Sequence, residues 1–265
     1  MPSFKTNDAV KIHYQTYGAP ENQAVVFING YSASEATWIL QIESFKRAGF
    51  YVVSYDHRLH GRSDKVDYGL TIQRLAFDLK ELLDELKLSQ PILIGHSMGA
   101  SVILAYEQLF TDKDLLAVIT EDQAPLFLKA KDWLDGFGRE LSDLPRFMDS
   151  FPQIKLTRKP LSIELKRELG HTLLPFDFKA GRPLLQNAIV QDWRTTLTRE
   201  EVPHLFLAGS DSPIFPSSHA AAALALTKNP KSEAKVFDGC GHILHLESPA
   251  EFDEIILKFI QRVIT

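Results

Sequence analysis

One short segment constrains this chain more than any other. Gly95-His96-Ser97-Met98-Gly99 follows the apolar run Pro91–Ile94 and precedes an apolar stretch of helical character. A serine between a strand and a helix needs a sharp turn, and flanking glycines let neighbouring backbone pass without a side-chain clash. The turn would expose the Ser97 hydroxyl at a sheet edge and leave the Met98 N–H facing outward at the positive end of the helix dipole. The segment therefore predicts a nucleophile with one oxyanion donor beside it.

Apolar runs that end at turn residues alternate with helical patterns along the chain. We expect helices at Trp38–Arg47 and Thr71–Leu86. The expected strands are Val10–Tyr17, Ala24–Ile28, Tyr51–Tyr55, Pro91–Ile94, Leu115–Thr120, Val202–Ala208 and Ala234–Phe237. This alternation predicts an α/β fold with a mostly parallel sheet flanked by helices.

A long middle segment breaks the alternation. Between Phe127 and Asp192 the strand pattern stops, and five prolines divide a polar, helix-biased stretch into short pieces. We interpret residues 127–192 as a helical cap inserted into one core, which residues 1–126 and 193–265 form together.

Two further segments belong with Ser97. Asn29-Gly30-Tyr31 follows the buried strand Ala24–Ile28, so the Tyr31 N–H is a candidate second oxyanion donor. Gly239-Cys240-Gly241-His242 lies on a loop after the last expected strand, where a histidine is free to reach a serine. We expect His242 to be the general base.

The order of these segments resembles the α/β-hydrolase superfamily, in particular its small esterase and lipase-like members. Asp56–Ser63 (DHRLHGRS) is similar to the family's D-x-R-x-x-G-x-S loop, and Pro249–Phe252 is like its P-x-x-F helix start. The resemblance implies the α/β-hydrolase fold with a small cap after the sixth strand. It also implies an acyl-enzyme mechanism that cleaves a small-molecule ester and needs no cofactor and no metal.

The acid that orients His242 departs from the family pattern. The family usually supplies it three residues after the glycine that ends the strand near Val202, and here Ser212 occupies that position. Asp122, just past the strand that follows the nucleophile helix, is the acid we favour, because some family members place it there. Asp211 stays open as the alternative acid if the loop shifts by one residue.

Aromatic and small residues near these segments are candidates for the substrate pocket and suggest an apolar acyl or alcohol site. The candidates are Gly30, His96, Trp38, Phe127, Trp133 and Phe215.

Charge and composition exclude several classes of partner and site. A net charge of −5 provides no broad positive field, so we expect no nucleic-acid partner. The only cysteine, Cys240, excludes an intramolecular disulfide and a zinc site built on cysteines. No apolar run of about 18 residues is present, and the N-terminal sequence lacks a signal-peptide pattern, so we expect a cytoplasmic protein without a membrane span.

Two other functions stay open on the sequence alone. One is a cofactor-free dioxygenase, since some proteins of similar fold use a histidine with an acid placed as Asp122 is. The other is a non-catalytic ligand-binding member. Within the hydrolase reading, cleavage of a lactone, thioester, amide or C–C bond remains an alternative to ester cleavage.

Overall fold

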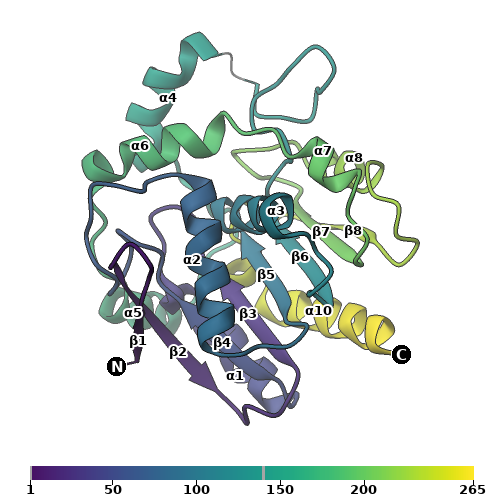
Figure 1. Ribbon diagram of the computed structural model, residues 1–265. Coiled ribbons are helices and arrows are strands. Elements are labelled where there is room, and N and C mark those ends of the chain that lie inside the picture. Colours follow the sequence, from purple (N-terminus) through teal and green to yellow (C-terminus); the bar gives the residue numbers. More distant parts are fainter. Residues whose placement is uncertain (1, 139–140) are drawn as a thin grey trace.

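An eight-stranded sheet forms the centre of the molecule (Figure 1). The computed structural model describes residues 2–138 and 141–265. The strand order is β1-β2-β4-β3-β5-β6-β7-β8, in which β1–β2 and β2–β4 are antiparallel and the other pairs are parallel. The strands are β1 (Ser3–Lys5), β2 (Lys11–Tyr17), β3 (Ala24–Ile28), β4 (Tyr51–Tyr55), β5 (Ile92–His96), β6 (Ala117–Glu121), β7 (His204–Gly209) and β8 (Glu233–Phe237). The expected α/β fold with a mostly parallel sheet is confirmed.

The buried strands show how apolar runs specify this sheet. All five residues of β3 are buried, and they alternate between the two faces: Val26 and Ile28 enter one core cluster, while Val25 and Phe27 enter the other. Successive side chains of a strand point to opposite faces, so a strand covered on both sides must be apolar throughout. β3 and β4 therefore begin and end where the sequence predicts, whereas β7 begins after Pro203, which has no N–H to donate to the sheet.

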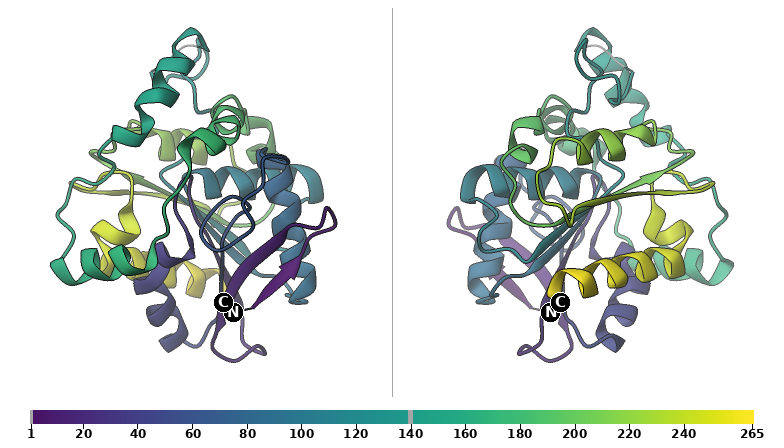
Figure 2. Two further views of the ribbon diagram at one scale, coloured as in Figure 1. Left: turned by 90° about the vertical axis from the view of Figure 1, so that its left-hand side faces the viewer. Right: turned by 90° about the vertical axis from the view of Figure 1, so that its right-hand side faces the viewer.

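Helices cover both faces of the sheet (Figure 2). On one face lie α2 (Ile72–Glu85), α3 (Met98–Phe110) and α8 (Ser218–Leu224), whose buried side chains enter the first cluster. On the other face lie α1 (Ile39–Arg47) and α10 (Pro249–Ile264), whose buried side chains enter the second. Two short helices, η1 (Glu35–Trp38) and α9 (Leu244–Glu247), precede α1 and α10.

The segment interpreted as a cap contains helices and no strand of the sheet within its described residues. Its helices are η2 (Leu141–Asp143), α4 (Leu144–Ser150), η3 (Phe151–Gln153), α5 (Ile163–Thr172) and α6 (Phe178–Ile189), and α7 (Arg194–Leu197) follows. α4 and α6 lie above the carboxyl ends of the parallel strands (Figure 1). α5 instead lies low on the molecule, beside η1, so the chain leaves the cap region and returns to it.

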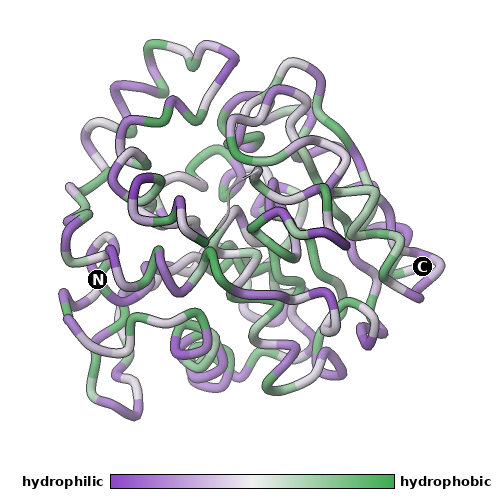
Figure 3. Tube along the Cα trace, turned by 90° about the horizontal axis from the view of Figure 1, so that it is seen from above, coloured by the Kyte–Doolittle hydropathy of each residue, from purple (hydrophilic) through white to green (hydrophobic). Residues whose placement is uncertain are grey.

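Seen from above, the side on which α4 and α6 lie in Figure 1, hydrophilic stretches are frequent in the loops along the periphery of the molecule (Figure 3). The parallel strands β3, β5, β6 and β7 end below these loops. Because ligands of open α/β sheets bind beyond the carboxyl ends of the strands, this edge is where a site is expected.

Candidate active site

Ser97 sits in a tight turn between β5 and α3. Its φ is 53° and its ψ −120°, a backbone conformation that costs a non-glycine residue on the order of 1–3 kcal/mol and is found mostly at functional sites. Its N–H donates to the Glu121 carbonyl at 2.8 Å. A Cβ on Gly99 would lie 2.3 Å from the Ile28 carbonyl oxygen, so this helix approaches β3 as closely as only glycine allows. The turn leaves Ser97 partly exposed in an otherwise buried neighbourhood.

The two residues expected to supply oxyanion donors, Tyr31 and Met98, line the same cavity as Ser97. Met98 is the first residue of α3, so its N–H has no acceptor within the helix and lies at the positive end of the helix dipole. Tyr31 lies in the loop after β3, and its neighbour Ser32 has a φ of 62°. The Ser32 N–H donates to His60 Nε2 at 3.2 Å, and His60 Nδ1 donates to the Arg58 carbonyl, which fixes the tautomer. Burial lowers the pKa of His60 to about 4, so the acceptor nitrogen stays unprotonated near neutral pH.

His242 reaches this edge from the loop after β8. Its Nδ1 donates to Asp122 Oδ2 at 2.6 Å, and its ring is 2% exposed. A carboxylate only accepts, so the proton is on Nδ1 and Nε2 carries the free lone pair. His242 and Ser97 line the same cavity.

Asp122 is a fully buried carboxylate surrounded by donors. Its φ of 46° turns the chain at the end of β6. Besides His242, it accepts from the Gly209 N–H at 3.0 Å and from the Ser212 hydroxyl at 2.6 Å, and His219 Nε2 lies 3.5 Å from Oδ1. Burial alone would raise the pKa of Asp122, but the neighbouring His219 and His242 outweigh it and hold the pKa well below its usual range. The surroundings of Asp122 thus favour its ionised form.

The alternative acid lies elsewhere. Asp211 is exposed, and its carboxylate accepts from the Ser210 hydroxyl at 3.1 Å while its N–H donates to the Cys240 carbonyl. Ser212, at the position where similar enzymes carry their acid, instead donates to Asp122. Sequence reasoning missed this role of Ser212 and the approach of His219, because both join residues about 90 positions apart in the chain.

A second layer of histidines supports His242 from behind. His96 Nε2 donates to the His242 carbonyl at 3.0 Å. His245 Nδ1 contacts the Glu121 carboxylate at 2.8 Å, and its ring stacks on Trp38 with centroids 4.0 Å apart. Burial lowers the pKa of both His96 and His245 to about 3 and raises that of Glu121 to about 7. Burial therefore favours the neutral form of both histidines near neutral pH.

A small cavity of about 20 Å³ separates the serine from the helices above it. That volume is room for about one water molecule. Its lining is mostly apolar, and Tyr31, Ser101 and Gln123 add polar groups beside Ser97 and His242. The lining residues are Tyr31, Ser97, Met98, Ser101, Gln123, Phe127, Phe151, Leu185, Ala188, Ile189, Ile214 and His242.

The structure divides the expected pocket residues. Phe127 lines the cavity, and Phe215 packs against its ring with centroids 5.0 Å apart. Trp133 is buried in the loop after Phe127, near the guanidinium of Arg194. Trp38 lies across the sheet, in the cluster that includes α1 and α10.

The remaining two pocket candidates lie beneath the serine turn, where Gly30 passes close to the His96 ring. Three of the cavity residues that sequence reasoning missed, Leu185, Ala188 and Ile189, come from α6. Ser101 had a signal, because it lies four positions after Ser97 on the same face of α3.

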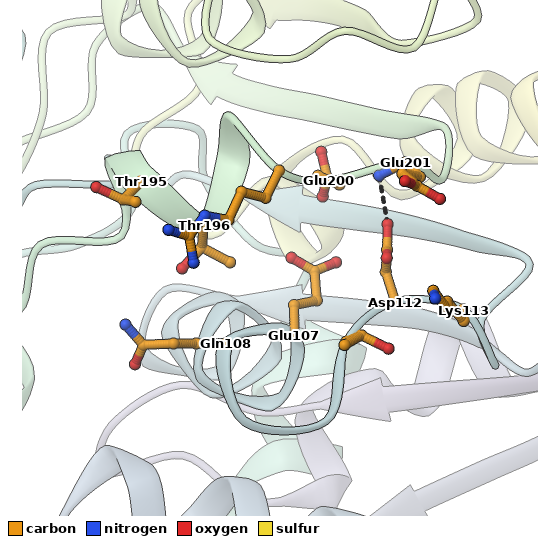
Figure 4. Close-up of a pocket in the computed structure, with 10 residues that line it drawn as sticks. Glu107, Gln108, Asp112, Lys113, Thr195, Thr196, Glu200 and Glu201 are labelled. Carbon is orange, nitrogen blue, oxygen red and sulfur yellow. Dashed lines mark hydrogen bonds between the residues drawn. The ribbon is translucent and has the colours of Figure 1, made fainter.

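A second hollow, of about 250 Å³, lies at the far end of α3. Glu107 is ten positions from Ser97 in this helix, or about 15 Å along its axis. Figure 4 shows its carboxylate directed from α3 towards the segment that carries Glu200. His204 Nδ1 contacts Glu200 at 2.6 Å, and His204 Nε2 contacts the Thr120 hydroxyl at 2.8 Å. This hollow brings acids together without a serine or cysteine nucleophile in its lining.

No group of three or more histidine, cysteine, aspartate or glutamate side chains in residues 2–138 and 141–265 is arranged to hold a metal ion. None of the helices in these ranges is long and apolar enough to cross a membrane.

Comparisons with known proteins identify the family to which this chain belongs. The sequence model of the alpha/beta hydrolase family matches residues 25–255. A non-heme chloroperoxidase of Burkholderia pyrrocinia is 26% identical over 279 residues, which cover 98% of this chain and 100% of that protein. A bifunctional esterase/perhydrolase of Acinetobacter calcoaceticus is 30% identical over 139 residues, covering 52% of this chain and 50% of that protein. The structure of an esterase from Exiguobacterium antarcticum superimposes with a TM-score of 0.87 at 20% identity and covers 98% of both chains.

Proposed function

Because the chain belongs to the alpha/beta hydrolase family, we propose that it is a serine hydrolase that cleaves small carboxylic esters through an acyl-enzyme. The observation that carries the proposal is the 2.6 Å bond from His242 Nδ1 to Asp122, at a cavity that Ser97 also lines. That bond leaves Nε2 as the only basic atom of the neutral His242 ring. His242 and Ser97 line the same cavity, so Nε2 is the candidate acceptor of the serine proton.

In the first half-reaction, Ser97 Oγ forms a bond to the ester carbonyl carbon while its proton passes to His242 Nε2. The π electrons of the carbonyl move to its oxygen, and the N–H groups of Tyr31 and Met98 donate to that oxyanion. Asp122 keeps the imidazole in the required tautomer and stabilises the imidazolium. Collapse of the intermediate breaks the bond to the leaving oxygen, which takes the proton from His242 and departs as an alcohol.

In the second half-reaction, water replaces the alcohol. His242 removes a proton from water as the hydroxide oxygen bonds to the acyl carbon, and the same two N–H groups hold the second oxyanion. Collapse breaks the bond to Ser97 Oγ, which regains its proton from His242, and the carboxylic acid leaves. Every proton in this cycle is carried by groups of the chain, which supports an ester hydrolase that works without a cofactor.

The cavity supports a short acyl group. About 20 Å³ beside Ser97 admits little more than an acetyl methyl group, and Phe151, Leu185 and Ile189 close it from above. Longer acyl chains would have to displace these side chains. A methylene group of the acyl chain contributes about 1 kcal/mol of binding free energy only if the cavity has room for it. We therefore expect turnover of p-nitrophenyl acetate to exceed that of the decanoate by about 10-fold or more.

The test is p-nitrophenyl ester hydrolysis from acetate to decanoate by wild type and Ser97→Ala. Loss of turnover in Ser97→Ala with preference for acetate supports the proposal. Equal turnover by the two proteins would refute the role of Ser97, and preference for decanoate would refute the acyl-size assignment.

A second acyl acceptor is worth testing because the Acinetobacter relative is named a bifunctional esterase/perhydrolase. The same acyl-enzyme would yield a peroxy acid if hydrogen peroxide, rather than water, attacked the acyl carbon. Hydrogen peroxide is scarcely larger than water, so the cavity favours neither by size. Acetate and peracetate formed from an acetyl ester at graded peroxide concentrations measure the partition.

A further inference from the structure

The loop that carries His242 is crossed by another part of the chain. Residues 154–162, which we call the strap, connect η3 to α5. At one end, Phe151 lines the active-site cavity and its ring lies 5.5 Å from that of Tyr31. At the other end, Leu165 and Leu169 of α5 pack with Leu246, four positions after His242. The strap therefore spans from the cavity roof to the far side of the His242 loop.

The strap contacts the loop backbone directly. The His242 N–H donates to the Leu156 carbonyl at 2.8 Å. A Cβ on Gly241 would lie 2.4 Å from the Leu156 carbonyl oxygen and 3.1 Å from the Arg158 nitrogen. Glycine at position 241 is thus required for the strap to lie where it does, which gives the Gly-Cys-Gly-His segment a reason beyond loop flexibility.

A single buried carboxylate joins the two segments from below. Glu247 Oε2 accepts from the Arg158 N–H at 2.6 Å and from the Lys159 N–H at 2.8 Å, both in the strap. The same carboxylate accepts from the Gly241 N–H at 3.0 Å and the Ile243 N–H at 3.3 Å, on either side of His242. Four amides of two segments that are about 85 positions apart in the chain converge on one side chain.

The chemistry of these contacts makes a carboxylate hard to replace. Buried backbone N–H groups need acceptors, and an ionised carboxylate offers about four acceptor positions in hydrogen bonds roughly twice as strong as neutral ones. A glutamine in the same place would keep one oxygen and turn an NH₂ group towards amides that also donate. Glu→Gln therefore breaks the junction while preserving size.

We propose that Glu247 is a positioning residue that clamps the His242 loop to the strap, so that the imidazole stays beside Ser97 only while the strap is seated. The inference rests on the proposed hydrolase function and adds to it a link between the cap and the base. Displacement of the strap, by substrate entry or by movement of α5, would withdraw the base from the serine.

The first test compares Glu247→Gln with Glu254→Gln, a matched change at an exposed position of α10. Glu247→Gln is expected to lower kcat for p-nitrophenyl acetate by about 10- to 100-fold, the effect of misplacing a catalytic group by about 1 Å. KM is expected to change by less than about 3-fold, because substrate contacts are intact. Labelling of Ser97 by a fluorophosphonate is expected to slow by the same factor as kcat. Equal kcat values for the two variants would overturn the proposal.

The second test measures whether Glu247 holds the two segments together, and it does not depend on catalytic activity. Hydrogen exchange followed by mass spectrometry is expected to quicken in Glu247→Gln at both 156–159 and 241–243. Faster exchange in only one of the two segments contradicts the clamp. If Glu247→Gln does not fold, Glu247→Asp, whose carboxylate is one methylene shorter, is subject to the same two criteria.

These measurements also separate the clamp from the function on which it rests. A wild-type protein that neither turns over esters nor reacts with the fluorophosphonate refutes the hydrolase proposal, and hydrogen exchange then still decides whether Glu247 joins the segments. If Ser97→Ala is inactive while Glu247→Gln keeps the kcat of wild type, the clamp is refuted and the hydrolase proposal stands.

Discussion

Two of the buried histidine–carboxylate pairs lie at opposite ends of the parallel sheet. His242 and Asp122 meet beyond the carboxyl ends of the strands, and His204 and Glu200 meet where β7 begins. Their contact distances are both 2.6 Å, yet their electrostatic settings are opposite. Asp122 is surrounded by donors that hold its pKa well below the usual range, whereas burial raises the pKa of Glu200 to about 8.

The neighbours of each carboxylate explain the difference. Asp122 faces an amide, a hydroxyl and two imidazoles, while Glu200 faces the carboxyl group of Glu107 across the second hollow (Figure 4). Burial raises the pKa of Glu107 well above its ordinary value, and Glu200 adds to the effect. A buried histidine–carboxylate pair therefore favours the ionised acid at Asp122 and the protonated acid at Glu200. In the proposed mechanism an ionised acid stabilises the imidazolium, so the surroundings of Asp122 suit that role and those of Glu200 do not.

The largest expected effect comes from breaking the pair of His242 and Asp122. Asp122→Asn removes the acceptor that fixes the His242 tautomer, and kcat for p-nitrophenyl acetate should fall by about 10³- to 10⁴-fold. Asp211→Asn is the matched control, since Asp211 is exposed and bonds to Ser210, and its kcat should stay within about 2-fold of wild type. The reverse ranking in parallel steady-state assays would transfer the role to Asp211.

A double variant sharpens the same comparison. Ser212 donates to Asp122 at 2.6 Å, so a carboxylate at position 212 would lie close to the His242 ring. Asp122→Asn/Ser212→Asp is expected to recover about 10- to 100-fold of the kcat lost in Asp122→Asn. No recovery in a double variant that melts like the single one would show that position 212 cannot supply the acid in this fold.

The smallest expected effect concerns the pair of His204 and Glu200, and it changes the free energy of unfolding rather than the activity. Both glutamates have an ordinary pKa of 4.5, and the folded state raises the pKa of Glu200 to about 8. Between these values the folded chain holds more protons than the unfolded chain, so stability falls as the pH rises from about 4.5 to 8. Glu107→Gln removes one acid and offers Glu200 a donor, and it should stabilise the protein by about 1–3 kcal/mol at pH 9 and by less at pH 5.

Urea unfolding of wild type, Glu107→Gln and the exposed-site control Glu164→Gln at both pH values measures this difference. If the free energy of unfolding of wild type and Glu107→Gln depends on pH in the same way, the raised pKa values of Glu107 and Glu200 do not govern stability.

Much of the fold could be predicted because its signals are local. β3 and β4 are short apolar runs bounded by turn residues, and the structure begins and ends them at the expected positions. The three-residue β1 and the alanine-rich α8 were missed, since their partners, rather than their own patterns, define them. Trp38 was expected at the pocket but packs across the sheet on His245, because aromatic character does not reveal which face of a sheet a residue joins.

The site divides in the same way. The serine turn and the histidine loop carry local signatures, namely glycines where backbone must pass closely. The surroundings of Asp122 do not, because its positive φ and its bonds to Ser212 and His242 arise only when β6, β7 and β8 lie side by side. Glu247 had no sequence signal at all, since its partners in the strap are backbone amides about 85 positions away.

The central claim is that Ser97 is a nucleophile activated by His242, and fluorophosphonate labelling tests it most directly. Intact-mass spectrometry should show one phosphonyl adduct on wild type, with peptide mapping placing it on Ser97, and no adduct on Ser97→Ala under the same conditions. An unlabelled wild type, or an adduct that persists in Ser97→Ala, would contradict the account.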